Sequence, residues 1–154
     1  MKKNLFRLLC ILLLSLMLSQ FLYGHAYADI VSTLYTVAGI VFSIGLGLIS
    51  GFDLRDIKNK EYLEKIRHNI KATRSSFIFF FSYATFALLV FLYFGKNDYS
   101  WHFKKIEIIL RLDIGVFAVL SILFSILYFV VNFLALQKLR DQITDRILEE
   151  SKNK

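Results

Sequence analysis

The chain has a single cysteine, no proline and four long stretches without charged residues. Its 154 residues include no proline and a single cysteine, Cys10, so no disulfide bond and no cysteine-rich metal site forms within it. Four long stretches, residues 8–28, 30–52, 75–95 and 114–137, contain no Asp, Glu, Lys or Arg. A soluble helix of that length carries charged residues on its solvent face, so the missing charges exclude an ordinary soluble domain.

Apolar side chains fill these stretches, and 56% of the chain is hydrophobic. Each stretch has about 20 residues or slightly more, and at about 1.5 Å per residue such a helix crosses a hydrocarbon core of roughly 30 Å. A helix also satisfies its own backbone hydrogen bonds in lipid. We therefore predict an all-α, multi-pass membrane protein: a small helical bundle with three mature transmembrane helices, or four if the N-terminal segment is retained.

The N-terminal segment, residues 1–28, fits two interpretations. Lys2, Lys3 and Arg7 precede an apolar run that ends in an A-x-A pattern at residues 26–28, as in a cleaved signal peptide. The next apolar run begins at Ile30, directly beyond that pattern, as expected if residues 1–28 are instead an uncleaved first transmembrane helix. In both cases residues 29–154 form one membrane domain, with spans near 30–52, 75–95 and 114–137.

Basic residues determine the predicted topology. Seven Lys and Arg residues lie in the loop 53–74 and five in the tail 138–154, against four in the loop 96–113. Because basic residues collect on the cytoplasmic side, we predict a multi-pass protein of the cell (inner) membrane with a cytoplasmic C-terminus. The net charge of +7 has the same explanation. We expect the lipid bilayer, with anionic lipid at the basic loop, as a partner, and no nucleic acid.

The segments between the spans show helical spacing. We predict an amphipathic helix capped by Asp53, which either lies on the inner leaflet or forms a solvated linker. In the outer loop, Ile106, Ile109 and Leu110 suggest a short helix leading into the last span. The tail 138–154 continues the last helix, and its apolar positions favour either a short coiled coil or packing on the inner loop. Those apolar positions are Leu54, Ile57, Leu63, Ile66 and Ile70 in the loop, and Leu136, Leu139, Ile143 and Ile147 near the tail.

Two patterns inside the spans are candidate functional features. Gly39, Ser43, Gly47 and Gly51 recur every four residues and form what we call the small-residue face, which favours close helix packing. Ser121, Ser125, Tyr128 and Asn132 follow one side of the last span and form what we call the polar seam. Such a seam acts either as interhelical hydrogen-bonding glue or as the lining of a pore or ligand groove; packing is the commoner role.

Motifs for catalysis are absent. The sequence holds no H-E-x-x-H, G-x-S-x-G or P-loop pattern, and His25, His68 and His102 are far apart. No His, Cys or Met lies in the spans 75–95 and 114–137 to ligate a haem. We therefore predict no enzyme activity, no cofactor and no metal site.

Three functional hypotheses follow. The first is a non-catalytic interaction module or accessory subunit, which assembles as a homo-oligomer or with a membrane-protein partner through the small-residue face. The alternative is an oligomeric channel or membrane-permeabilising effector lined by the last span. In layout alone the chain looks like many small bacterial inner-membrane proteins, holin-like permeabilising proteins among them. The third is an enzyme or cofactor protein with a site at the outer surface.

Overall fold

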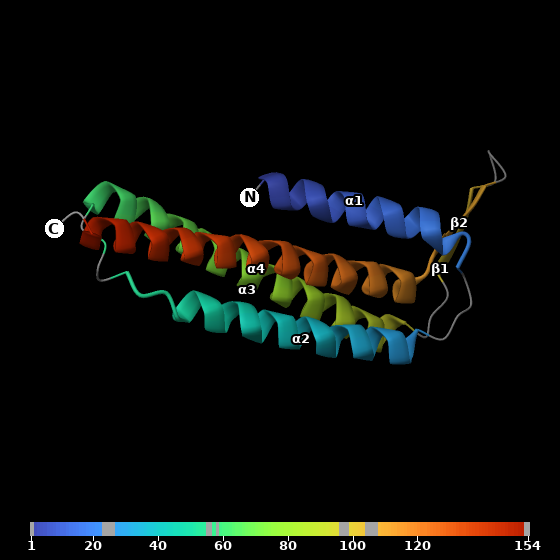
Figure 1. Cartoon of the computed structure of the whole chain (residues 1–154). Helices are drawn as coiled ribbons and strands as arrows, with labels where there is room; N and C mark the ends of the chain where they lie inside the picture. Colours follow the sequence, from blue (N-terminus) through green and yellow to red (C-terminus); the bar gives the residue numbers. More distant parts are fainter. Residues whose placement is uncertain are drawn as a thin grey trace.

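The computed structural model describes residues 2–22, 27–54, 57, 59–95, 99–103 and 108–152, with side chains placed within residues 7–22, 27–54, 57, 59–95 and 113–146. Within these ranges the chain forms four helices and one two-stranded hairpin. In chain order they are α1 (Lys2–Ser19), α2 (Ala28–Ser50), α3 (Lys60–Phe94), β1 (Tyr99–Phe103), β2 (Ile108–Leu112) and α4 (Ile114–Lys152). Figure 1 shows the helices running side by side, with α1 along α4 and the hairpin at one end.

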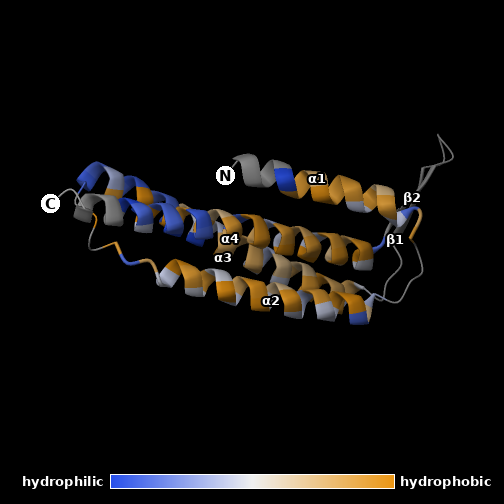
Figure 2. Ribbon diagram, viewed as in Figure 1, coloured by the Kyte–Doolittle hydropathy of each residue, from blue (hydrophilic) through white to orange (hydrophobic). Residues whose placement is uncertain are grey.

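Three of the helices, α2, α3 and α4, are long and apolar enough to cross a membrane. This confirms the predicted fold class, a multi-pass all-α bundle. In α1 the apolar part is shorter, Arg7–Ser19. The apolar zones of the helices lie level with one another, and the polar ends of α3 and α4 extend past the end of α2 (Figure 2).

The helix predicted to begin at Asp53 begins later. Its N-cap is Asn59, whose side-chain oxygen accepts a hydrogen bond from the Tyr62 backbone N–H at 3.1 Å. Residues 52–54 are not helical, so the prediction of Asp53 as the cap was wrong. The following helix is also not a separate element, because α3 runs unbroken from Lys60 through the second predicted span to Phe94. At about 1.5 Å per residue, α3 is about 52 Å long, which exceeds the roughly 30 Å of a hydrocarbon core.

The surplus length of α3 and α4 forms a paired extension, residues 60–74 and 138–146, which we call the stalk. Ile66 of α3 and Ile143 of α4 are buried there, together with Ile57 from the linker. The apolar side of this part of α3 is therefore covered by α4 rather than left free for a leaflet. Of the two interpretations of the tail, packing on the inner loop is the one that the structure supports; the side chain of Ile147 lies outside the described residues.

Inside the apolar zone, the core changes character along the bundle. Toward the hairpin it is built from small and aliphatic side chains, and toward the stalk from aromatic rings. The first cluster is Val31, Ala38, Ala84, Ala118 and Ile122; the second is Ile49, Phe77, Phe80, Phe129 and Leu136. All three spanning helices contribute to this core, which is mainly small and aliphatic toward the hairpin and mainly aromatic toward the stalk.

The loop 96–113, which we predicted to lie outside the membrane, contains strands where we predicted a helix. β1 and β2 pair antiparallel, with Tyr99 opposite Leu112 and Phe103 opposite Ile108. Ile109 and Leu110 therefore lie in a strand, and Ile106 lies outside the described residues. The helical spacing was misleading because the segment is rich in β-branched and aromatic residues, which favour a paired strand.

Candidate functional site

The polar seam begins in the interface between α3 and α4. Ser121 and Ser125 are both fully buried. The Ser121 hydroxyl lies 2.9 Å from the Tyr83 hydroxyl of α3, within hydrogen-bonding distance. The Ser125 hydroxyl donates within its own helix to the Ser121 carbonyl at 3.0 Å, and it also lies 3.3 Å from the Phe80 carbonyl of α3. The first half of the seam therefore joins two helices of the same chain.

The second half of the seam lies at the edge of the bundle. The Tyr128 ring stands 4.1 Å from the Phe80 ring, measured between centroids, and the Arg7 guanidinium of α1 lies 5.7 Å from the Tyr128 ring centre. Asn132 is half-buried, and its amide donates to the Tyr128 carbonyl one turn earlier at 2.7 Å. At about 1.5 Å per residue, Asn132 is about 27 Å along α4 from Ile114, near the far limit of a hydrocarbon core.

The small-residue face of α2 points away from the bundle. A Cβ atom added at Gly39 or at Gly47 would meet nothing within 4 Å. Ser43 is exposed, and its hydroxyl donates to the Gly39 carbonyl at 2.8 Å. Gly51 ends the helix as its C-cap. Within the described part of the chain, then, the face contacts no other helix, and its one hydroxyl is bonded to its own backbone.

Two glycines outside the small-residue face lie under aromatic rings. A Cβ atom at Gly45 would overlap the Phe77 ring of α3, and one at Gly115 would overlap the Tyr27 ring. Gly45 is only two residues from Gly47, but at about 100° per residue the two point to nearly opposite sides of α2. The close internal contact of α2 is therefore made at Gly45, beside the buried residues Val31, Ala38 and Ile49.

One hydroxyl pair joins α2 to α3. The Tyr35 hydroxyl lies 2.9 Å from the Thr85 hydroxyl, and the latter donates to the Phe81 carbonyl at 2.9 Å. Sequence reasoning missed Tyr35, Tyr83 and Thr85. The available signal was that a tyrosine hydroxyl in an apolar span needs a hydrogen-bonding partner.

The start of α4 is held by α1. Ser15 and Ser19 are fully buried, and the Ser19 hydroxyl accepts a hydrogen bond from the Asp113 backbone N–H at 3.2 Å. The Asp113 carboxylate in turn accepts hydrogen bonds from the N–H groups of Gly115 and Val116, at 2.7 and 3.3 Å. A carboxylate in this position caps the helix and complements its dipole.

Tyr27 completes this end of the bundle. Its hydroxyl donates to the Leu22 carbonyl, and its ring covers Gly115. Partial burial raises the pKa of Tyr27 above its ordinary value, and the negative charge of Asp113 raises it further. Both causes favour the neutral phenol.

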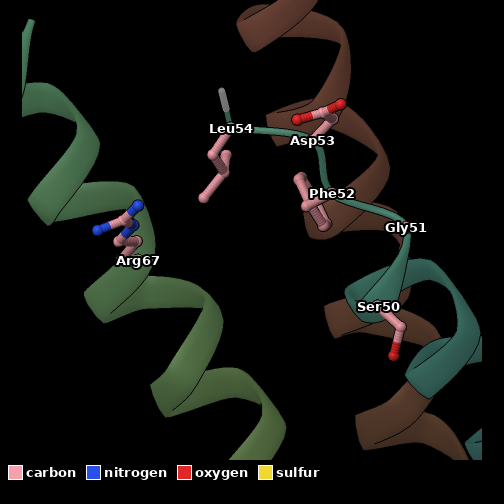
Figure 3. Close-up of a pocket in the computed structure, with 6 residues that line it drawn as sticks. All are labelled: Ser50, Gly51, Phe52, Asp53, Leu54 and Arg67. Carbon is pink, nitrogen blue, oxygen red and sulfur yellow. The ribbon is translucent and has the colours of Figure 1, made fainter. Parts of the chain in front are cut away.

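A hollow of about 470 Å³ lies at the other end of α2, where Ser50 to Leu54 turn away from the helix and face Arg67 of α3. Figure 3 shows the Arg67 guanidinium on the opposite side of this hollow from Asp53. The lining combines one acid, one base and one hydroxyl. It does not bring together a nucleophile, a base and an orienting group, so it does not form a catalytic constellation.

Metal-binding residues do not gather in the described part of the chain, where no group of three or more His, Cys, Asp or Glu side chains is found. Comparison of the chain with protein families, with curated proteins and with solved structures gives no match.

Proposed function

We propose that the chain is a non-catalytic membrane interaction module, which associates through the small-residue face of α2 with a second copy of itself or with a transmembrane helix of a partner protein. The observation that carries this proposal is the open space above Gly39 and Gly47. Small residues let a second helix backbone approach closely, and dispersion then stabilises the contact. Since the Ser43 hydroxyl already bonds to its own helix, the face contains no polar group that opposes such packing.

The size of the purified protein in mild detergent tests this proposal. Gly47→Leu should reduce the fraction of oligomer, because a large side chain would fill the space that a neighbouring backbone needs. Val37→Leu is the matched control, since Val37 is an exposed residue of the same helix that lies about 80° around the helix from Gly47. Equal oligomer fractions in the two variants would contradict self-association through the small-residue face.

The alternative, an oligomeric channel or permeabilising effector lined by α4, predicts leaky liposomes. The burial of Ser121 and Ser125 against α3 supports the interaction module instead, because these hydroxyls already have partners within one chain. Liposomes that contain the purified protein should therefore retain an encapsulated dye. Rapid release of the dye would favour the channel.

We also propose an inner-membrane location. In this orientation both helices of the stalk, and hence the C-terminus, lie in the cytoplasm. The excess of basic residues in 53–74 and 138–154 supports this orientation. In a Cys10→Ser background, a cysteine at Asn97 should react with an impermeant thiol reagent in intact cells, and a cysteine at Asn59 should not. The reverse labelling would overturn the orientation.

Residues 1–28 are either a removed signal or a retained first helix, and the packing of α1 supports retention. Ser15 and Ser19 are buried against the bundle, and Ser19 bonds to the residue that caps α4. An intact mass that includes residues 1–28 is expected on this basis. A purified chain that begins at Asp29 would establish removal instead.

A further inference from the structure

A groove between α3 and α4, at the level where the spans meet the stalk, has a lining suited to an anion. Its volume is about 380 Å³, and its polar lining residues are Asn69, Thr73, Asn132, Lys138 and Gln142. These side chains offer three primary amides, one hydroxyl and one ammonium group as donors. Among the described residues, no carboxylate lines the groove.

The groove lies at the depth of lipid headgroups. Counted at about 1.5 Å per residue from the hairpin ends of the two helices, Asn132 and Thr73 lie about 27 and 31 Å along them, and Lys138 lies about 36 Å along α4. A hydrocarbon core is roughly 30 Å thick, and a headgroup layer of several ångströms lies beyond it. Asn132 therefore marks the edge of the core, and Lys138 stands among the phosphates.

A second cation lies near the deep end of the groove. Arg7 of α1 stands over the Tyr128 ring, and Tyr128 is one turn before Asn132 on the same side of α4. Lys138 at one end of the groove and Arg7 near the other place two cations along this part of α4. A long basic side chain at a membrane boundary normally directs its charge toward the phosphates.

We propose that this groove binds the phosphate of an anionic phospholipid, with the Lys138 ammonium paired to the phosphate and the amides of Asn69 and Gln142 donating to its oxygens or to the glycerol headgroup. The acyl chains would then lie along the apolar surface of α4 that continues from the groove. This site is independent of the proposed assembly, because the small-residue face is on α2. Free inorganic phosphate shares the same chemistry, and the experiment separates the two sources.

Native mass spectrometry of the full chain in mild detergent, with phosphatidylglycerol or phosphatidylcholine added, tests the proposal. The wild type should retain phosphatidylglycerol in preference to phosphatidylcholine. Lys138→Ala should lower that retention by about tenfold, as expected for the loss of a charge-assisted hydrogen bond. Arg140→Ala is the matched control. It removes the same charge two residues away, at a position that does not line the groove. Gln142→Leu should lower the retention in the same direction but less strongly.

An excess of inorganic phosphate should leave the phosphatidylglycerol bound, because the acyl chains add contacts that the free ion lacks. Displacement of the lipid by phosphate would overturn the assignment to a lipid. Equal losses in the Lys138→Ala and Arg140→Ala variants would overturn the site itself, since only the overall surface charge would then matter. Unchanged retention of phosphatidylglycerol by Lys138→Ala would also overturn the site.

Discussion

Two pairs of glycines in the apolar zone have opposite surroundings. Gly45 and Gly115 lie under the rings of Phe77 and Tyr27, whereas Gly39 and Gly47 face open space. The first pair allows close packing inside one chain. The second pair leaves room for a backbone from outside it. A small residue in a span therefore indicates a close approach, but only the position of the neighbouring rings decides whether that approach is internal or external.

The largest expected effects come from changing the contact between Gly45 and Phe77. Gly45→Leu should lower the free energy of unfolding by about 3 kcal/mol or more, because the new side chain would overlap the buried Phe77 ring. Chemical unfolding in detergent, followed by circular dichroism, measures the loss. Gly47→Leu is the control: it makes the same change two residues along the same helix, and it should leave the fold of the single chain intact.

A second substitution makes this comparison sharper. Phe77→Ala alone should destabilise the protein by about 3–5 kcal/mol, because it opens a cavity in the aromatic cluster. In the Gly45→Leu background the same change should cost less, since the leucine occupies part of the vacated space. Additive losses in the double variant would mean that Gly45 and Phe77 do not share a contact.

The three spanning helices and the continuous tail followed from hydropathy and helical spacing alone. The roles of Gly45 and Gly47 did not, because they occur together in a Gly-Leu-Gly sequence and differ only in whether Phe77, 32 residues away along the chain, lies above them. The polar seam was predicted, but its partners Tyr83 and Phe80 were not, because one sequence does not show which helices are neighbours. The hairpin was missed because its apolar residues fit helical spacing as well as strand pairing.

Asn132 provides a smaller test at the edge of the bundle. Asn132→Leu should change the free energy of unfolding by less than about 1 kcal/mol, because its amide donates to its own helix and it lies near the membrane surface. Ser125→Leu should cost more, since Ser125 is fully buried against α3. A larger loss for Asn132→Leu than for Ser125→Leu in the same unfolding assay would contradict this placement. Asn132 would then be the covered position on α4, and Ser125 the open one.

The smallest expected effect concerns Tyr27, the ring that covers Gly115. The pKa of Tyr27 is raised in the folded protein by partial burial and by Asp113, so the folded state holds the phenol proton more tightly than the unfolded state does. The resulting stability is fully present below about pH 10, the ordinary tyrosine value, and is lost as the pH rises through the folded-state pKa. Tyr27→Phe should flatten the dependence of the unfolding midpoint on pH above 10. If Tyr27→Phe leaves this pH dependence unchanged, other groups cause the loss of stability above pH 10.

The unbroken course of α3 has a mechanical consequence. Between Lys60 and Phe94 the helix contains neither glycine nor proline, the residues at which helices most often bend. α4 has neither residue after Gly115. A lateral force on the stalk would therefore not bend either helix at a glycine or proline between the stalk and the spans. Each helix would move as a stiff rod, and the displacement would tilt the helices at the Phe77 and Phe80 layer and at the hairpin of β1 and β2.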